Sequence, residues 1–255
     1  MSNKIMKKEV YLMGSGPGDP ELLTIRAYNV LKRADVVLYD NLSSQELLNI
    51  APKTCIMVYV GKKPYQACTP QEKINELIVD YARSYQVVIR LKGGDPFIFG
   101  RGFEELLFAE SQGIQVEYIP GISSMQGAGF IDIPLTHRGI SESVWMITGT
   151  KKDGSLSNDL KCAMKSSATV VIYMGMKKLA EIAAAYEAAG RGGTPAAIIQ
   201  HATLPQQKQV VSTVGELPKA AFRAGLSNPA IIIIGDVVKV REVLAQVNTS
   251  HYCAV

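Results

Sequence analysis

Two glycines, an aspartate and a proline follow an apolar stretch directly in VIRLKGGDPFIFGRGFEE, which runs from Val88 to Glu105. The proline ends a strand, the glycines leave the backbone open to close approach, and Asp95 puts a carboxylate at the tip. A simple connection between two elements needs fewer such residues. The segment therefore predicts a turn at which the backbone meets a ligand.

A second glycine-rich turn, GSGPGDPELLT, occupies residues 14–24. It follows an apolar run and precedes a helical pattern, as nucleotide loops do, but a structural turn alone is equally typical. Asp19 stands where a dinucleotide loop needs its third glycine, and the chain contains no G-x-x-x-x-G-K-[ST]. A carboxylate at this point repels pyrophosphate. The predicted ligand therefore lacks a phosphate cradle and combines hydroxyls with an ammonium group, as S-adenosylmethionine does.

Apolar runs alternate with helical patterns along the chain, which predicts an α/β protein with mainly parallel sheets. The ends of three predicted strands, at Gly14, Asp40 and Gly93, then converge on one sheet edge, where such folds bind ligands. The predicted strands are 10–14, 35–40, 55–61, 87–95, 115–120, 144–149, 168–175, 195–202, 208–213 and 228–238. The predicted helices are 21–34, 43–50, 69–84, 101–113 and an alanine-rich helix that ends at Gly190.

The pattern restarts after a small-residue stretch at 120–129, which predicts an N-terminal lobe over 1–120 and a C-terminal lobe over 121–240. Residues 241–255 lack periodicity and are expected to form an irregular tail. Thr69, Pro70 and Glu72 predict a capping box with a proline start. The residues TLPQQ between strands 195–202 and 208–213 predict an antiparallel hairpin.

Composition places the chain among ordinary globular proteins, with 47% hydrophobic and 20% charged residues. The net charge of +4 is too small to imply a nucleic-acid coat, and it suits a small anionic substrate. No apolar run reaches the roughly 18 residues that span a bilayer, and the first ten residues do not form a secretory signal. Four scattered cysteines (Cys55, Cys68, Cys162 and Cys253) predict free thiols in the cytoplasm. Three dispersed histidines argue against a metal site.

The motifs GSGPGD, DVVLYD, VGKK, RLKGGDPFIFGRG, PGISS, PLTHR and VIYMG occur in the order that is found in the tetrapyrrole methylases. Over roughly residues 10–240 the chain resembles that family, and most of all its uroporphyrinogen-III C-methyltransferase branch. Two positions depart from the branch. Lys63 replaces a usual arginine, and Phe103 replaces a usual glycine and is expected to narrow the pocket.

The resemblance implies the tetrapyrrole methylase fold with S-adenosylmethionine in a cleft between the two lobes. Glycines admit a cofactor close to the backbone, and Asp95 can accept hydrogen bonds from its hydroxyl or ammonium groups. Met174 is more often an ordinary core residue, and only its place in YMG favours a cofactor contact. By position, the implied cofactor contacts are Pro17, Gly93, Gly94, Asp95, Ile98, Ser123, Ser124, Met174, Ala202 and Ala230.

The implied reaction is the methylation of two pyrrole carbons of uroporphyrinogen III, through precorrin-1 to precorrin-2, in siroheme- or cobalamin-type biosynthesis. Asp40 and Lys62 match the family's acid–base pair; as alternatives, Asp40 caps the next helix and Lys62 binds a substrate carboxylate. The eight substrate carboxylates require cationic partners. The residues expected to bind them are Lys63, Arg101, His137 and Arg138, and Arg101 is also assigned to catalysis. A homodimer is implied, with no metal, nucleic acid or membrane partner.

Three alternatives stay open at this point. A nicotinamide oxidoreductase requires a better dinucleotide loop than 14–19 provides. In a cofactor-free binding protein the glycine loops are only turns. An RNA methylase of the same fold requires a basic face studded with aromatic residues, whereas aromatic residues make up 7% of this chain.

Overall fold

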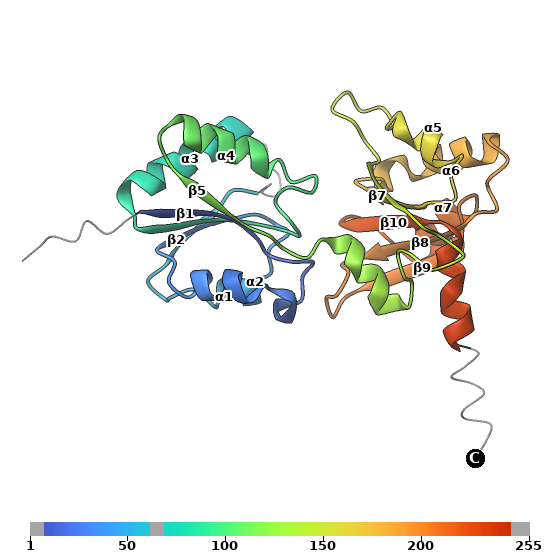
Figure 1. The fold of residues 1–255 in the computed structure, drawn as a ribbon, viewed down its shortest axis with the longest axis horizontal. Helices are drawn as coiled ribbons and strands as arrows, with labels where there is room; N and C mark the ends of the chain where they lie inside the picture. Colours follow the sequence, from blue (N-terminus) through green and yellow to red (C-terminus); the bar gives the residue numbers. More distant parts are fainter. Residues whose placement is uncertain (1–7, 62–68, 246–255) are drawn as a thin grey trace, which may run out of the picture. The chain divides into compact units, whose positions relative to one another are not determined.

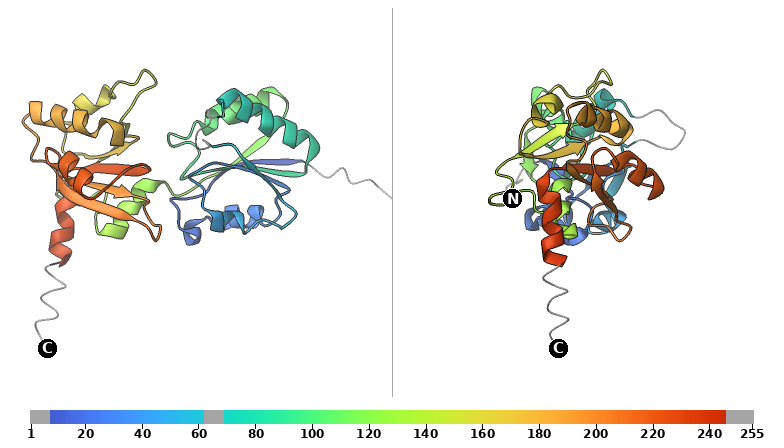
Figure 2. Two further views of the ribbon diagram at one scale, coloured as in Figure 1. Left: turned by 180° about the vertical axis from the view of Figure 1, so that it is seen from behind. Right: turned by 90° about the vertical axis from the view of Figure 1, so that its right-hand side faces the viewer.

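The structure, a computed structural model, describes residues 8–61 and 69–245. The chain divides into two compact units, unit 1 (Met1–Ser123) and unit 2 (Ser124–Val255). Each unit has a sheet with helices on both faces, as seen from the front and from behind (Figures 1 and 2).

The described part of unit 1 holds a five-stranded sheet in the order β3-β2-β4-β1-β5, and all four pairings are parallel. This confirms the parallel sheet that the sequence predicts for the first half. The strands are β1 (Glu9–Gly14), β2 (Val36–Tyr39), β3 (Ile56–Tyr59), β4 (Val87–Lys92) and β5 (Val116–Ile119). The helices are η1 (Pro20–Leu22), α1 (Ile25–Leu31), α2 (Gln45–Leu48), α3 (Gln71–Ser84) and α4 (Gly102–Ser111).

Alternate residues of these strands point to two separate cores. Tyr11 and Met13 pack with α1 and α2 on one face, and Val10 and Val88 pack with α3 and α4 on the other (Figure 1). The central strand β4 is buried along its whole length. A strand that is covered on both faces must be apolar nearly throughout, so the two charged residues that β4 carries require internal partners.

The described part of unit 2 also holds a five-stranded sheet, in the order β6-β7-β10-β8-β9. Only β6 and β7 pair in parallel there; the other three pairings are antiparallel, including the predicted hairpin. The prediction of a mainly parallel sheet is therefore wrong for unit 2, because β10 runs between β7 and β8 and opposes both. The strands are β6 (Val144–Thr148), β7 (Thr169–Tyr173), β8 (Pro195–Gln200), β9 (Lys208–Thr213) and β10 (Ala230–Ile234).

Helices α5 (Asp159–Ala163), α6 (Leu179–Ala188) and α7 (Leu217–Arg223) cover one face of this sheet. The 3₁₀ helices η2 (Ser124–Ile131) and η4 (Asp236–Lys239) pack on the other face. A further 3₁₀ helix, η3 (Met176–Lys178), precedes α6.

Local predictions fail at three helix ends. Helix α3 begins at Gln71 without a side-chain cap, so Thr69 and Glu72 do not form the predicted capping box; the Gln71 side chain instead donates to Asn75 and Glu105. The predicted helix 21–34 is interrupted, because Thr24 is extended and caps the N-terminus of α1. Residues 241–245 are helical where an irregular tail was expected, and 246–255 lie outside the described residues.

Asp95 joins the turn after β4 to the end of β5. Its carboxylate accepts hydrogen bonds from the Phe97 N–H (2.8 Å), the Tyr118 hydroxyl (2.6 Å) and the Gly121 N–H (3.1 Å). The Tyr118 ring also stacks on Phe97 with 4.1 Å between ring centroids. Burial raises the pKa of Tyr118 above its ordinary value, and the hydrogen bond to Asp95 raises it further.

This contact predicts a loss of stability at alkaline pH that depends on Tyr118. Because its pKa is higher in the folded than in the unfolded protein, its contribution is present below the unfolded value of about 10 and is lost as the pH rises toward the folded value. We expect Tyr118→Phe to flatten the decline in the free energy of unfolding above pH 10. Urea unfolding at pH 8 and pH 11 measures this, with Tyr28→Phe at an exposed tyrosine as control. Equal declines in the parent and in Tyr118→Phe would contradict the prediction.

Candidate functional site

Three glycine turns meet at the carboxyl-terminal edge of the sheet in unit 1. Gly16 and Gly94 exchange two backbone hydrogen bonds, of 2.7 and 3.2 Å. A Cβ built on Gly14 would lie 2.6 Å from the Gly94 carbonyl oxygen, and one built on Gly121 would lie 2.1 Å from the same atom. Only glycine permits this contact between backbones. We call this set, Gly14, Gly16, Gly94 and Gly121, the glycine edge.

The glycine edge brings together the first group of predicted cofactor contacts: Pro17, Gly93, Gly94 and Asp95, with Ile98 in the following turn and Ser123 in the segment after β5. Gly94 has a φ of 65°, where any residue with a Cβ is strained. A bulky residue at Gly94 would therefore perturb the fold as well as any ligand, so this position is unsuited to a test of binding.

The turn after β2 also belongs to this edge. A Cβ on Gly93 would lie 2.3 Å from the Leu42 Cβ, so the turns after β2 and β4 pack directly on each other. Asp40 opens the first of these turns, and its Oδ1 accepts the Leu42 N–H at 3.1 Å. Ser44, not Asp40, caps α2, so the alternative role of Asp40 as a helix cap is wrong. The predicted convergence of Gly14, Asp40 and Gly93 is confirmed.

Four charged side chains form a cluster here: Asp40 after β2, Arg90 and Lys92 of β4, and Glu105 of α4. We call it the buried charge cluster. Arg90 Nη2 lies 3.1 Å from Asp40 Oδ2, and Lys92 Nζ lies 3.0 Å from Glu105 Oε1. The side chains of Arg90, Lys92 and Glu105 are each exposed by 8% or less. Burial lowers the pKa of Lys92, and the charge of Arg90 lowers it further, although Glu105 opposes both effects.

In unit 2, strand pairing brings Met174, Ala202 and Ala230 to one sheet edge. Ala230 pairs with Gln200 and the next residue pairs with Tyr173, so the end of β7, the end of β8 and the start of β10 coincide. Met174 is 50% exposed and has a φ of 55°. The alternative that Met174 is an ordinary core residue is therefore wrong, because its thioether side chain lies open at this edge.

The 3₁₀ helix η2 packs beside the same edge and begins at Ser124. The Met125 N–H donates to the Tyr173 hydroxyl at 3.1 Å, and a Cβ on Gly127 would lie 2.6 Å from the Ala202 Cβ. Ser124 thus lies near the same sheet edge of unit 2 as Met174, Ala202 and Ala230.

His137 and Arg138 lie on an exposed hairpin in unit 2. The backbone of His137 pairs with Ser141, and the Ser141 hydroxyl accepts the Thr169 N–H at 3.0 Å. Thr169 begins β7, whereas Met174 follows the end of that strand. The hairpin is therefore anchored at the end of the sheet opposite to Met174.

Arg101 stands at the N-terminus of α4 with a φ of 57°, and its side chain is 55% exposed. Its guanidinium makes two contacts with Glu104, of 2.7 and 3.0 Å, and this hydrogen bonding raises the pKa of Arg101. Phe103, which is 57% exposed, makes an edge contact with Phe97. Lys62 and Lys63 lie outside the described residues.

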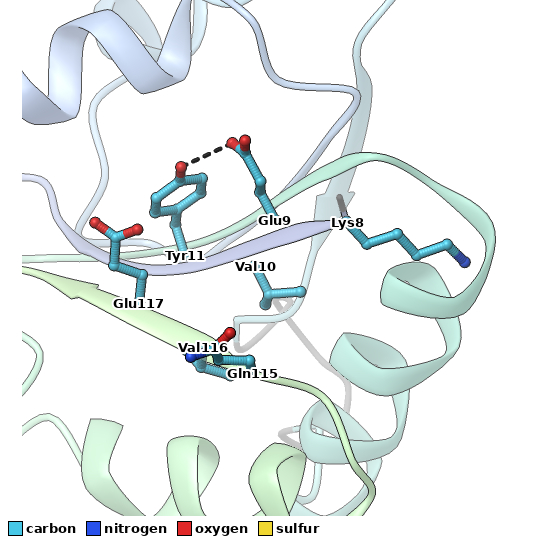
Figure 3. A pocket seen from close by; sticks show the side chains of 7 residues that line it. All are labelled: Lys8, Glu9, Val10, Tyr11, Gln115, Val116 and Glu117. Carbon is cyan, nitrogen blue, oxygen red and sulfur yellow. Dashed lines mark hydrogen bonds between the residues drawn. The ribbon is translucent and has the colours of Figure 1, made fainter. Parts of the chain in front are cut away.

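A hollow in unit 1 lies at the other end of the sheet. It is lined by Lys8, Glu9, Val10, Tyr11, Gln115, Val116 and Glu117, where β1 and β5 begin (Figure 3). The Tyr11 hydroxyl donates to Glu9, Arg33 pairs with Glu9, and Arg26 pairs with Glu117. These charges are mutually satisfied, and the hollow is separated from the glycine edge by the length of β1.

Within residues 8–61 and 69–245 no group of three or more histidine, cysteine, aspartate or glutamate side chains is placed to hold a metal ion. No helix in the same ranges is long and apolar enough to cross a membrane.

Sequence reasoning missed Arg90, Glu105 and Tyr118 as parts of this region. A usable signal was present for Arg90 and, indirectly, for its carboxylate partner Glu105. Arg90 and Lys92 are two residues apart in a strand that is otherwise apolar, so both face the same helix layer and need a buried carboxylate there. No local pattern identifies Tyr118.

Comparison with known proteins places the chain in a family. The model of the tetrapyrrole (corrin/porphyrin) methylases matches residues 9–218. A siroheme synthase of Chromobacterium violaceum is 45% identical over 248 residues, which are 96% of this chain and 53% of that protein. The chain thus spans about half the length of the curated relatives that it matches.

Solved structures are similar to the chain over most of its length. A uroporphyrin-III C-methyltransferase of Thermus thermophilus in complex with S-adenyl homocysteine is 39% identical, with a TM-score of 0.79 over 91% of this chain and 99% of that one. A cobalt precorrin-4 methyltransferase is 25% identical, with a TM-score of 0.81 over 90% and 95% of the two chains. With a family match across most of its length, this chain belongs to the tetrapyrrole methylases.

Proposed function

We propose that this protein transfers methyl groups from S-adenosylmethionine to two pyrrole carbons of uroporphyrinogen III and forms precorrin-2 through precorrin-1. The observation that carries the proposal is the exposed Met174 at a sheet edge, next to Ala202 and Ala230. The relatives named above, one of them in complex with S-adenyl homocysteine, support the same assignment.

The residues present suit this cofactor. The exposed Met174 thioether lies at the same sheet edge as the partly exposed Ala230 and the buried Ala202, and methionine sulfur packs well on rings such as a purine. In unit 1, Gly93, Gly94 and Gly121 are partly exposed and carry no side chain that would obstruct a ligand approaching the backbone. Asp95 already accepts three internal hydrogen bonds, so we assign it first to holding the Gly93–Asp95 turn in place. The location of the cofactor between the lobes stays a prediction.

The cofactor supplies a methyl group on a sulfonium centre. The nucleophile is an electron-rich pyrrole carbon, so the protein need not provide one. Its residues align the ring carbon with the methyl group and exclude water. The new carbon–carbon bond forms as the methyl–sulfur bond breaks, and the ring then loses a proton. We assign acid–base assistance in this step to Asp40 and Lys62.

The substrate's carboxylates require accessible cations. We assign this role to Arg101, with Lys63, His137 and Arg138 as further contacts. Arg101 and the His137–Arg138 hairpin are exposed. We further propose that the protein is a cytoplasmic homodimer that contributes to siroheme- or cobalamin-type biosynthesis.

The proposal predicts turnover of uroporphyrinogen III. The purified chain should transfer labelled methyl groups from S-adenosylmethionine to this substrate, with two methyl groups per product molecule. Mass spectrometry of the product and scintillation counting measure both. Total RNA is tested as an alternative methyl acceptor, and NAD is tested by calorimetry as an alternative ligand. The proposal would be contradicted if RNA were methylated and uroporphyrinogen III were not, or if the protein bound NAD but did not bind S-adenosylmethionine.

A second prediction separates the two roles open to Arg101. If its guanidinium binds a substrate carboxylate, Arg101→Ala should lower kcat/KM about 10- to 100-fold, because a charge-assisted hydrogen bond contributes roughly 1.5–3 kcal/mol. Affinity for S-adenosylmethionine should hardly change. Arg101→Lys should also be impaired, since lysine lacks the planar, two-pronged geometry.

Glu104→Gln is the matched control, because it removes the ion pair but keeps Arg101. This variant should retain the parental kcat/KM, as an exposed ion pair contributes about 0–1 kcal/mol to stability. Parental kcat/KM in Arg101→Ala would show that Arg101 does not bind the substrate and only forms the ion pair with Glu104.

A further inference from the structure

We propose that Arg90 is a positioning residue that holds the Asp40 carboxylate at the carboxyl-terminal edge of the sheet in unit 1. The inference rests on the role proposed for Asp40 in proton transfer. Arg90 is itself too deeply buried to be a substrate contact, since its side chain is 4% exposed, whereas that of Asp40 is 23% exposed. Asp40 is thus the member of the pair that is open to solvent.

The Arg90 guanidinium is held in one orientation by contacts on three sides. Nη1 donates to the Leu91 carbonyl at 2.7 Å, Nε lies 3.4 Å from Glu105, and Nη2 donates to Asp40 Oδ2 at 3.1 Å. A planar group whose other nitrogens are held in this way presents the remaining N–H in a defined direction. Asp40 therefore receives its hydrogen bond from a fixed donor.

Glu105 is itself held in place and therefore fixes the position of Arg90. Its side chain is 1% exposed, and it also accepts hydrogen bonds from Lys92 Nζ and Gln71 Nε2, each at 3.0 Å. These partners come from β4 and α3, while Glu105 itself lies on α4. The cluster contains two cations and two carboxylates, so its charges balance. Buried ion pairs of this kind can fix a geometry more than they add to stability.

Both oxygens of Asp40 are consequently engaged. Oδ2 faces Arg90, and Oδ1 faces the Leu42 N–H in the turn that packs on Gly93. The Asp40 carboxylate is therefore oriented by Arg90 of β4 and by the backbone of its own turn. Reactive groups must be held within about 0.5 Å of the productive geometry, and a 1 Å displacement can lower a rate about 100-fold.

The test is a double-mutant cycle on kcat for methyl transfer to uroporphyrinogen III. We expect Arg90→Met to lower kcat about 10- to 100-fold while KM and the affinity for S-adenosylhomocysteine change less than twofold. In the Asp40→Ala background the same change should lower kcat no further, because the group that it positions is already absent. Arg90→Lys should recover part of the loss, since it keeps the charge without the planar geometry.

Arg33→Met is the matched control, because Arg33 also pairs with a glutamate but lies at the amino-terminal end of the sheet. It should keep the parental kcat. Circular dichroism and urea unfolding establish that each variant is folded, and Arg90→Lys replaces Arg90→Met in the cycle if the latter does not fold. Additive losses in the cycle, parental kcat in the Arg90 variant, or parental kcat in Asp40→Ala would each overturn the inference. An inactive parent would instead refute the proposed function.

Discussion

The contact between the backbones of the turns after β1, β4 and β5 is the constraint on which unit 1 depends. Gly14, Gly94 and Gly121 approach so closely that a single Cβ at the first or third position would overlap the Gly94 carbonyl oxygen. This contact fixes where three strand ends lie. Gly94 and Gly121 remain partly exposed at this edge, where parallel sheets bind ligands. Asp95 reinforces the arrangement by binding Tyr118 and Gly121 from within.

The charged residues with proposed roles fall into a buried group and an exposed group. Arg90, Lys92 and Glu105 are buried in the sheet and its covering helices, where they form ion pairs, and Asp40 alone extends from the cluster toward solvent. Arg101 and the His137–Arg138 hairpin, by contrast, are exposed. Buried charges suit the positioning of a reactive group, and exposed cations suit the capture of a substrate with many carboxylates. The proposed division between positioning and binding is based on this difference in burial.

Much of unit 1 could be predicted from local sequence, because its strands are apolar runs bounded by glycine, proline and aspartate, and parallel pairing brings their ends together. The convergence of Gly14, Asp40 and Gly93 follows from that pattern. Strand direction in unit 2 could not be predicted, since β10 pairs with two strands distant in sequence and no local pattern encodes its insertion between them. The partners of Asp95 and Asp40 were missed for the same reason: Tyr118 and Arg90 lie 23 and 50 residues away. The exposure of Met174 depends on its backbone conformation, which the sequence does not display.

Hydrogen–deuterium exchange with and without S-adenosylhomocysteine is the most direct test of the cofactor contacts proposed at the sheet edge of each unit. We expect slower exchange on binding in residues 14–18 and 92–98 of unit 1 and, in the same experiment, in residues 124–126, 172–176 and 200–204 of unit 2. Slower exchange confined to one unit, or found around residues 8–11 and 115–117 at the opposite end of the first sheet, would contradict it.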